Sequence, residues 1–216
     1  MEYPGSLHNH SDYSNIRILD CINKVSDLIE RAGQLGHTVI ALTDHEFTGG
    51  WLKFKEAWQA NKEKYPNLQK CILGNEIYLV RNGLNKDNFK AGTDKYYHFI
   101  LLAKDREGAK QIQEISTKAW YRSYMARGMR RVPTYYQDLS EIIGENKGHI
   151  IASSACLGSA IGTQLLKYKE TQDENLYEKI KSWILRMDGI FGHGYFYLEM
   201  QPSHTKEQGA PSSRCP

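Results

Sequence analysis

The stretch GSLHNHSDYS, residues 5–14, places two histidines one residue apart near the start of the chain. We interpret its Leu-His-Asn-His run as a short strand and the exit from that strand. Because side chains at positions i and i+2 of a strand point to the same face, His8 and His10 are predicted to project together. Neutral imidazole is the commonest protein ligand for zinc and related cations. The spacing therefore predicts a metal site, although two histidines that merely share an exposed strand face would give the same pattern.

Further residues of metal-binding type occur in or just after other predicted strands, namely Asp44 and His45 in ALTDHE, Glu76 in LGNEIY, Cys156 after IIASSA and Glu199 in YFYLEM. In parallel α/β folds, sites form at the carboxyl ends of the strands. His98 opens its predicted strand, YYHFILLA, and a simple parallel arrangement would place it at the opposite edge. Imidazoles, carboxylates and a thiolate together suit zinc, manganese or iron better than magnesium alone. The pattern predicts a metal cluster at one mouth of a barrel.

Apolar spacing and turn residues divide the chain into alternating elements. The predicted helices cover 23–36, 49–66, 106–126, 135–143, 158–169 and 175–187, and the predicted strands cover 37–45, 70–80, 96–104, 148–155 and 194–201. This alternation is typical of an α/β domain with a largely parallel sheet. We expect one domain over residues 1–201, followed by a polar tail, 202–216, whose Gly, Pro and Ser content predicts disorder.

Composition restricts the class of protein. The chain has 216 residues and a formal net charge of +3, which is too small to indicate nucleic-acid binding unless the charge is concentrated locally. The four cysteines are widely spaced and no signal peptide precedes them, which indicates free thiols in the cytoplasm. No apolar run approaches the ~20 residues of a membrane span.

The segment 118–136, KAWYRSYMARGMRRVPTYY, combines four arginines with tryptophan and tyrosine. Such a mixture can bind nucleic acid through charge and stacking. We favour an amphipathic helix with a solvated basic face, and a surface for a protein partner is a third interpretation.

Four motifs, LHNHSDYS, ALTDHE, GNEIY and YHFILLAK, resemble the leading motifs of the PHP (polymerase and histidinol phosphatase) superfamily. Two further stretches, YSNIRILDCINKV and RVPTYYQDLSEII with its downstream IIASSACLGS, resemble one branch of it. That branch is the amino-terminal PHP domain of the DNA polymerase III alpha subunit of bacteria and phages. The resemblance covers about residues 3–201 and implies a distorted seven-stranded β/α barrel. The family's closing Asp-x-His motif is not found after 195–200, so we expect the last β/α unit to be missing.

The resemblance also implies a ligand set: His8, His10, Asp20, His45, Glu76, His98 and Cys156. These residues would hold two or three divalent cations, either zinc, manganese or iron, with magnesium as a further option. We expect catalytic roles for Glu76, as a carboxylate that bridges two cations, and for Asp44, as the group that orients His45 from behind. An equally good interpretation makes Asp44 a helix N-cap.

The activity implied by the resemblance is that of a metal-dependent phosphoesterase, here a 3′–5′ exonuclease in DNA replication. DNA and other replisome subunits are the expected partners, with no role for a membrane. The carboxylates that catalyse DNA synthesis in the family lie beyond residue 216, so we expect an amino-terminal fragment that cannot synthesise DNA. Two alternatives stay open: a structural module with an incomplete metal site, and a free-standing PHP phosphatase that acts on a small phosphate ester.

Overall fold

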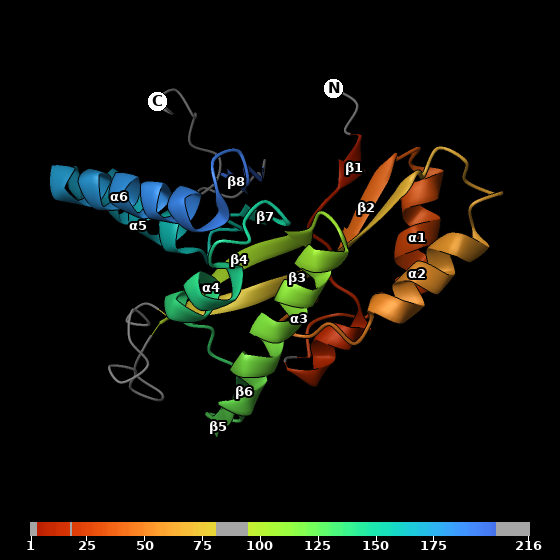
Figure 1. Cartoon of the computed structure of the whole chain (residues 1–216), viewed down its shortest axis with the longest axis horizontal. Coiled ribbons are helices and arrows are strands. Elements are labelled where there is room, and N and C mark those ends of the chain that lie inside the picture. Colours follow the sequence, from red (N-terminus) through yellow and green to blue (C-terminus); the bar gives the residue numbers. More distant parts are fainter. Residues whose placement is uncertain (1–3, 18, 81–94, 202–216) are drawn as a thin grey trace.

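The computed structural model describes residues 4–17, 19–80 and 95–201. Within them, a six-stranded sheet has the order β1-β2-β3-β4-β7-β8 and curls into part of a barrel (Figure 1). Its strands are β1 (Gly5–Ser6), β2 (Val39–Leu42), β3 (Lys70–Val80), β4 (Tyr96–Ala103), β7 (Ile150–Ser153) and β8 (Phe196–Tyr197). The prediction of an α/β fold of partial-barrel type is confirmed.

The sheet is mixed, and the prediction of a largely parallel sheet is wrong at β4. The pairs β1–β2, β2–β3 and β7–β8 are parallel, whereas β4 runs antiparallel to both β3 and β7. Because β4 runs the other way, its first residues lie at the edge where the parallel strands end. A parallel β4 would place His98 at the opposite edge of the sheet. In the antiparallel β4, His98 pairs with Tyr78 near the carboxyl end of β3 and lies at the same edge as the other candidate ligands.

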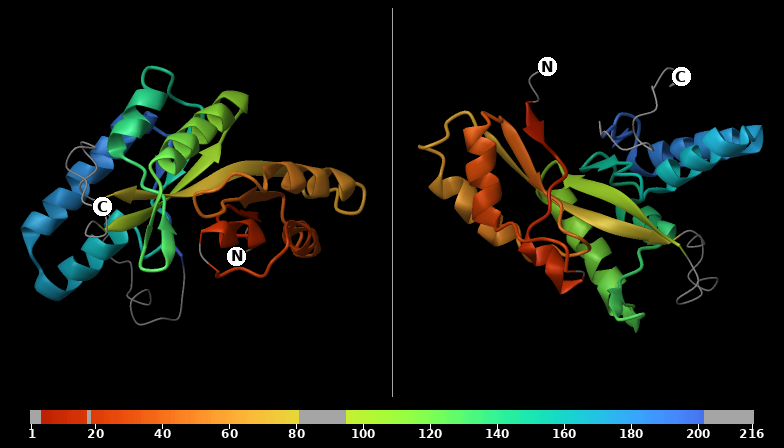
Figure 2. Two further views of the ribbon diagram at one scale, coloured as in Figure 1. Left: turned by 90° about the horizontal axis from the view of Figure 1, so that it is seen from below. Right: turned by 180° about the vertical axis from the view of Figure 1, so that it is seen from behind.

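The helices gather in pairs around the sheet (Figures 1 and 2). α1 (Val25–Gln34) and α2 (Trp51–Ala60) pack together on one flank, and α5 (Ala160–Thr171) and α6 (Glu174–Phe191) pack together on the opposite flank. α3 (Arg106–Tyr121) and α4 (Tyr136–Ile143) lie between these pairs. None of the helices in the described ranges is long and apolar enough to cross a membrane.

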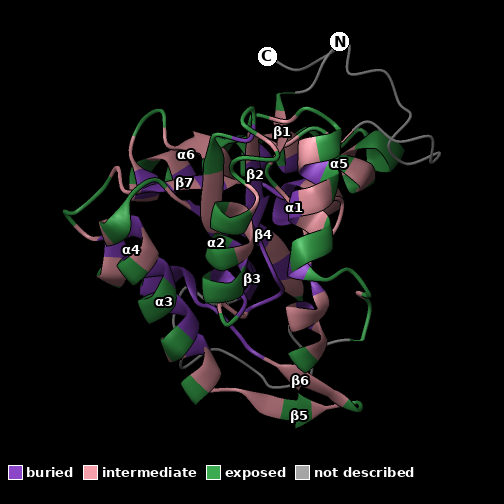
Figure 3. Ribbon diagram, turned by 90° about the vertical axis from the view of Figure 1, so that its right-hand side faces the viewer, coloured by how far each residue is buried: buried purple, intermediate pink, exposed green. Residues whose placement is uncertain are grey.

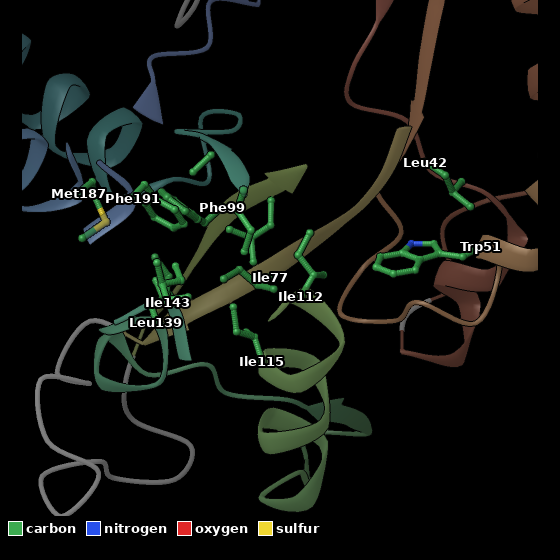
Figure 4. Close-up of a cluster of buried hydrophobic side chains, with 14 of the residues drawn as sticks. Leu42, Trp51, Ile77, Phe99, Ile112, Ile115, Leu139, Ile143, Met187 and Phe191 are labelled. Atoms are coloured by element: carbon green, nitrogen blue, oxygen red, sulfur yellow. The ribbon is translucent and has the colours of Figure 1, made fainter. Parts of the chain in front are cut away.

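One face of the sheet forms the main hydrophobic core with these helices. Ile77 of β3 and Phe99 of β4 are each 1% exposed and pack with Ile112 and Ile115 of α3 (Figure 4). The aromatic ring of Phe99 also stacks on that of Phe191, with the centroids 5.7 Å apart. Burying a side chain of this size contributes roughly 1.5–3 kcal/mol.

The opposite face of the same strands carries a smaller apolar cluster, Ala41, Ile100, Leu102 and Ala155. Beyond it, towards the carboxyl end of β3, the apolar residues give way to Glu76, Tyr78 and His98 on the same face. The residues of β2, β3 and β4 are mostly buried (Figure 3), so these polar side chains lie on strands that are largely shielded from water. The candidate site begins at this point.

The segment after α3 differs from the prediction. The helix ends at Tyr121, and a hairpin of β5 (Tyr124–Ala126) and β6 (Met129–Arg131) follows. Its two-residue turn has positive φ at both Arg127 (53°) and Gly128 (73°), the conformation that matches the twist of hairpin strands. The predictions of a helix to residue 126 and of an amphipathic helix through 118–136 are therefore wrong.

The chain before and after the sheet also differs in detail. His8 and His10 lie just after the short strand β1 rather than within a strand. The strand predicted over 194–201 is reduced to β8. The tail 202–216 lies outside the described residues, so the domain boundary at residue 201 stays a prediction.

Candidate metal centre

Glu76 is the centre of the candidate site. It lies on β3 beyond the end of β2, where His45 continues the pairing as an isolated bridge to Glu76. Its side chain is 1% exposed, and ring nitrogens of four histidines lie within 4 Å of its oxygens. A buried charge surrounded in this way is costly to assemble unless its partners compensate for the lost hydration.

Three of these histidines face the Oε2 atom of Glu76. His10 Nε2 lies 3.1 Å from it, His45 Nδ1 2.9 Å and His8 Nε2 3.6 Å. The His10 ring stacks on the His45 ring with centroids 4.1 Å apart, and the His8 ring meets the His10 ring edge-on at 5.1 Å. His8, His10 and Glu76 thus present ligand atoms within 4.8 Å of one another, close enough to hold one cation.

The Oε1 atom of Glu76 faces a second group. His98 Nδ1 lies 2.6 Å from Oε1 and 3.4 Å from the Sγ atom of Cys156. A Cβ atom on Gly158 would come within 3.0 Å of the His98 ring, so glycine permits this close approach. Glu76, His98 and Cys156 form a second set of ligand atoms within 4.8 Å of one another. Glu76 belongs to both groups and offers one oxygen to each.

The residues present fit divalent cations. The Nδ1 atom of His10 is buried and has no hydrogen-bond partner among the described residues, and both buried Glu76 oxygens have only imidazole nitrogens as close polar partners there, at 2.6–3.6 Å and without good hydrogen-bond angles. Native structures rarely leave buried polar atoms unpaired, and an ion is one of the standard explanations. Imidazole, carboxylate and thiolate donors favour zinc or other transition metals over magnesium.

A further layer of contacts orients His8. Its Nδ1 atom is hydrogen-bonded to Glu199 Oε1 at 2.8 Å, which leaves Nε2 directed to the Glu76 side. Ser153 at the end of β7 donates to Glu199 Oε2 at 2.5 Å, and Gln201 donates to Glu199 Oε1 at 2.6 Å. A carboxylate behind a metal-binding histidine sets the tautomer and orientation of the ring in this way.

His45 is held from two sides. The Asp20 carboxylate lies 3.2 Å from its Nε2 atom, and the Tyr78 hydroxyl is hydrogen-bonded to its Nδ1 atom at 3.0 Å. The guanidinium of Arg17 lies 3.8 Å above the Tyr78 ring and its Nε atom donates to Glu46 at 2.7 Å. Arg17 and Glu46 are almost completely buried, so this ion pair fixes the support behind His45.

Asp44 is buried, but its side-chain hydrogen bonds with the described residues do not involve an imidazole. It accepts from the backbone N–H and the hydroxyl of Ser11, at 2.6 and 2.8 Å, and from the hydroxyl of Ser14 at 2.8 Å. The N-cap of the following helix, α2, is Gly50. Asp44 therefore ties the segment after His10 to the end of β2, and a catalytic role for it stays a prediction.

The charges of the site depend on one another. Burial favours the neutral acid at Glu76, but the surrounding histidines hold its pKa well below the usual range. Burial lowers the pKa of His8, yet its hydrogen bond with Glu199 and the proximity of Glu76 raise that pKa to about 10. For His98 the same competition, with Cys156 and Glu76 as partners, raises the pKa to about 9. His98 also lowers the pKa of the Cys156 thiol against the effect of burial.

The structure thus brings five predicted ligands around Glu76 into one cluster and places Asp20 at its edge, where it is exposed beside His45. Their roles as ligands stay predictions. Tyr78 and Gln201 did not emerge from the sequence. Tyr78 had a usable signal, because it lies two residues after Glu76 on a strand and must share its face. The sequence indicates Glu199 as a residue of metal-binding type on a predicted strand, but its contact with His8, 191 residues away, is tertiary.

Comparison with known proteins agrees with this geometry. A family model described as "PHP domain" matches residues 6–203. "Probable DNA polymerase YorL" of Bacillus subtilis (strain 168) is 37% identical over 211 residues, which cover 93% of this chain and 16% of that protein. The DNA polymerase III subunit alpha of Borreliella burgdorferi is 33% identical, over 96% of this chain and 16% of the relative. The corresponding subunit of Aquifex aeolicus is 30% identical, over 94% of this chain and 16% of the relative.

The chain therefore spans 16% of the length of each of these relatives, and the match falls on the segment that contains the histidine cluster. The family model covers nearly all of the described residues, from β1 to β8. The chain belongs to the PHP domain family and is homologous to the PHP region of DNA polymerase III alpha subunits.

Proposed function

We propose that this chain is a metal-dependent phosphoesterase whose substrate is the 3′ end of single-stranded DNA, so that it acts as a 3′–5′ exonuclease in DNA replication. The observation that supports this most strongly is the buried Glu76 carboxylate, which offers one oxygen to each of two groups of ligand-type side chains. The proposed partners are DNA and other replication proteins, in the cytoplasm.

The proposed ligands divide between the two oxygens of Glu76. His8 and His10 would hold a cation on the Oε2 side, and His98 and Cys156 would hold one on the Oε1 side. When bound, divalent cations supply Lewis acidity to a phosphoester and lower the pKa of water.

The protein's own residues contribute orientation and charge. Glu199 holds the Nδ1 atom of His8, and Tyr78 holds that of His45, so that neither ring can turn freely. Glu76 is held in its ionised form, so its carboxylate contributes one negative charge to a cation that binds after His8 and His98 have lost their protons. The lowered pKa of Cys156 favours its thiolate form, which is the form that binds metals.

Metal content and exonuclease activity test this proposal together. Elemental analysis of the purified chain should find two or three equivalents of zinc, manganese or iron, and the double variant His8→Ala/His10→Ala should lose most of that metal. A matched control is His149→Ala/His193→Ala, which also removes two imidazoles; within the described residues their hydrogen bonds go to Asp105 and Asp188, outside the site.

The activity assay uses a single-stranded oligonucleotide labelled at its 5′ end. A ladder of products shortened from the 3′ end, absent in the His8/His10 variant, supports the exonuclease. Hydrolysis of a small phosphomonoester without the ladder would instead indicate a phosphatase. If neither the chain nor the control variant binds metal, the proposal fails and a structural role in a polymerase becomes the better interpretation.

A further inference from the structure

The hairpin β5–β6 and the end of α3 form a region of concentrated positive charge. Residues 115–137 contain no aspartate or glutamate, but they contain Lys118 and four arginines. Arg122 is neutralised, because it makes a two-pronged ion pair with Asp138 at 2.5 and 2.7 Å. Arg127, Arg130 and Arg131 have no ion pair with any residue of the described ranges. We call residues 124–131 the basic arm.

The basic arm adjoins the strand that carries His98. Tyr96 lies two residues before His98 on β4, so both side chains are on the metal-site face and about 7 Å apart along the strand. The Tyr96 hydroxyl is hydrogen-bonded to that of Tyr124 at 2.5 Å, and the Arg131 guanidinium lies 5.5 Å from the Tyr96 ring. Figure 1 shows the arm projecting from the body of the molecule beyond the end of α3. The arm thus begins at the rim of the metal centre and extends outward.

Aromatic side chains lie beside the arginines. The Arg130 guanidinium lies 5.9 Å from the Trp120 ring, and Trp120 meets Phe47 edge-on with centroids 6.0 Å apart. Phe47, Trp120 and Tyr121 line an open hollow of about 640 Å³ at the end of α3, and Tyr121 is 89% exposed. Unpaired bases stack on such side chains, whereas the bases of a duplex are already stacked.

From these contacts we infer that the basic arm binds the phosphate backbone of single-stranded DNA and directs it toward the Glu76 centre. The inference rests on the proposed function for the choice of DNA. The arginines bind phosphates whatever the base sequence, and the neighbouring aromatic rings stack with bases, so the binding is expected to be independent of sequence.

The test measures binding apart from hydrolysis. A fluorescein-labelled oligothymidylate of about 12 nucleotides is titrated with the chain in EDTA, which prevents metal-dependent cleavage, and its anisotropy is followed at salt concentrations between about 50 and 200 mM. The variant Arg127→Ala/Arg130→Ala/Arg131→Ala should bind at least about tenfold more weakly at the lowest salt. Loss of three phosphate contacts should also reduce the slope of log affinity against log salt by about 2.

Two further variants test whether the effect depends on positive charge and on its position in the arm. Arg127→Lys/Arg130→Lys/Arg131→Lys keeps the charge and should keep most of the salt slope. Lys169→Ala/Lys179→Ala/Lys181→Ala removes the same charge from the exposed surfaces of α5 and α6, on the far flank, and should bind like the unaltered chain. Circular dichroism melts establish that each variant is folded.

The outcomes separate this inference from the proposed function. Three results would overturn the inference that the basic arm binds DNA. They are no measurable binding by the unaltered chain, an unchanged affinity in the arginine-to-alanine variant, and an equal loss of affinity in the lysine-to-alanine control. If binding in EDTA depends on the arm but no metal-dependent cleavage occurs, the inference about the arm is supported and only the proposed exonuclease activity fails. Cleavage without arm-dependent binding would do the reverse.

Discussion

On β3 and β4, neighbouring residues lie in opposite environments. Ile77 and Phe99 pack into the helix-covered core, whereas Glu76 and His98, one residue before each of them, face the ligand cluster. The first face is apolar and buried, and the second surrounds a buried carboxylate with imidazole rings. Because successive side chains of a strand point to opposite faces, β3 and β4 contribute to the hydrophobic core on one face and to the ligand cluster on the other. Substitutions on the two faces should therefore have different consequences.

The largest effect on folding is expected from the core face. Phe99→Ala removes a ring that packs against Phe191, Phe196 and Trp183, and should lower the free energy of unfolding by about 3–5 kcal/mol. Urea denaturation measures this directly. Phe99→Leu is the milder control, and it should retain most of the stability. A loss below about 1 kcal/mol in Phe99→Ala would mean that the core does not depend on this face.

Glu76→Gln is the corresponding change on the other face. It keeps the size of the side chain but removes the charge shared by both ligand groups. We expect metal affinity to fall by at least about 100-fold, more than outer-layer substitutions usually cause. Isothermal titration with zinc measures the affinity, and the circular dichroism spectrum should be unchanged. Metal binding equal to that of the unaltered chain would show that Glu76 is no ligand.

Glu199→Gln sharpens the distinction between ligands and their supports. The amide can still contact His8 Nδ1, but it no longer carries the charge that favours the protonated Nδ1. Metal affinity should fall by about 10–100-fold while the number of bound ions stays the same. Loss of a whole equivalent of metal would instead identify Glu199 as a ligand.

The last prediction concerns the pH dependence of the metal-free chain. The pKa of His8 is raised from 6.5 to about 10, so the stabilisation that this represents is complete below about pH 6.5 and is lost as the pH rises through 10. In EDTA, the urea midpoint should decline between about pH 6.5 and 9.5, and His8→Gln should flatten this decline. Metal affinity should change in the opposite direction, because ligands bind cations only when deprotonated. A midpoint independent of pH would contradict the assigned contacts.

Much of the site could be predicted from the sequence because its ligand-type residues lie in compact local motifs. His8 and His10 are two residues apart, and His45 ends the strand predicted over 37–45, so the positions of strand ends and the family resemblance grouped them. The alternation of strands and helices likewise predicted the α/β class. The hairpin was missed because residues 106–126 have continuous helical spacing, and only the Arg127–Gly128 turn and the β5–β6 pairing override it.

The sequence by itself determined which residue types are available for metal binding, which strand faces are apolar and which family the motifs resemble. Only the tertiary structure decided that β4 runs antiparallel, and this direction brings His98 to Glu76. It also decided that Glu199 supports His8 across 191 residues and that the basic arm starts beside Tyr96. The physical reason is that local propensity acts over a few residues, whereas strand direction and such contacts depend on the packing of the whole sheet.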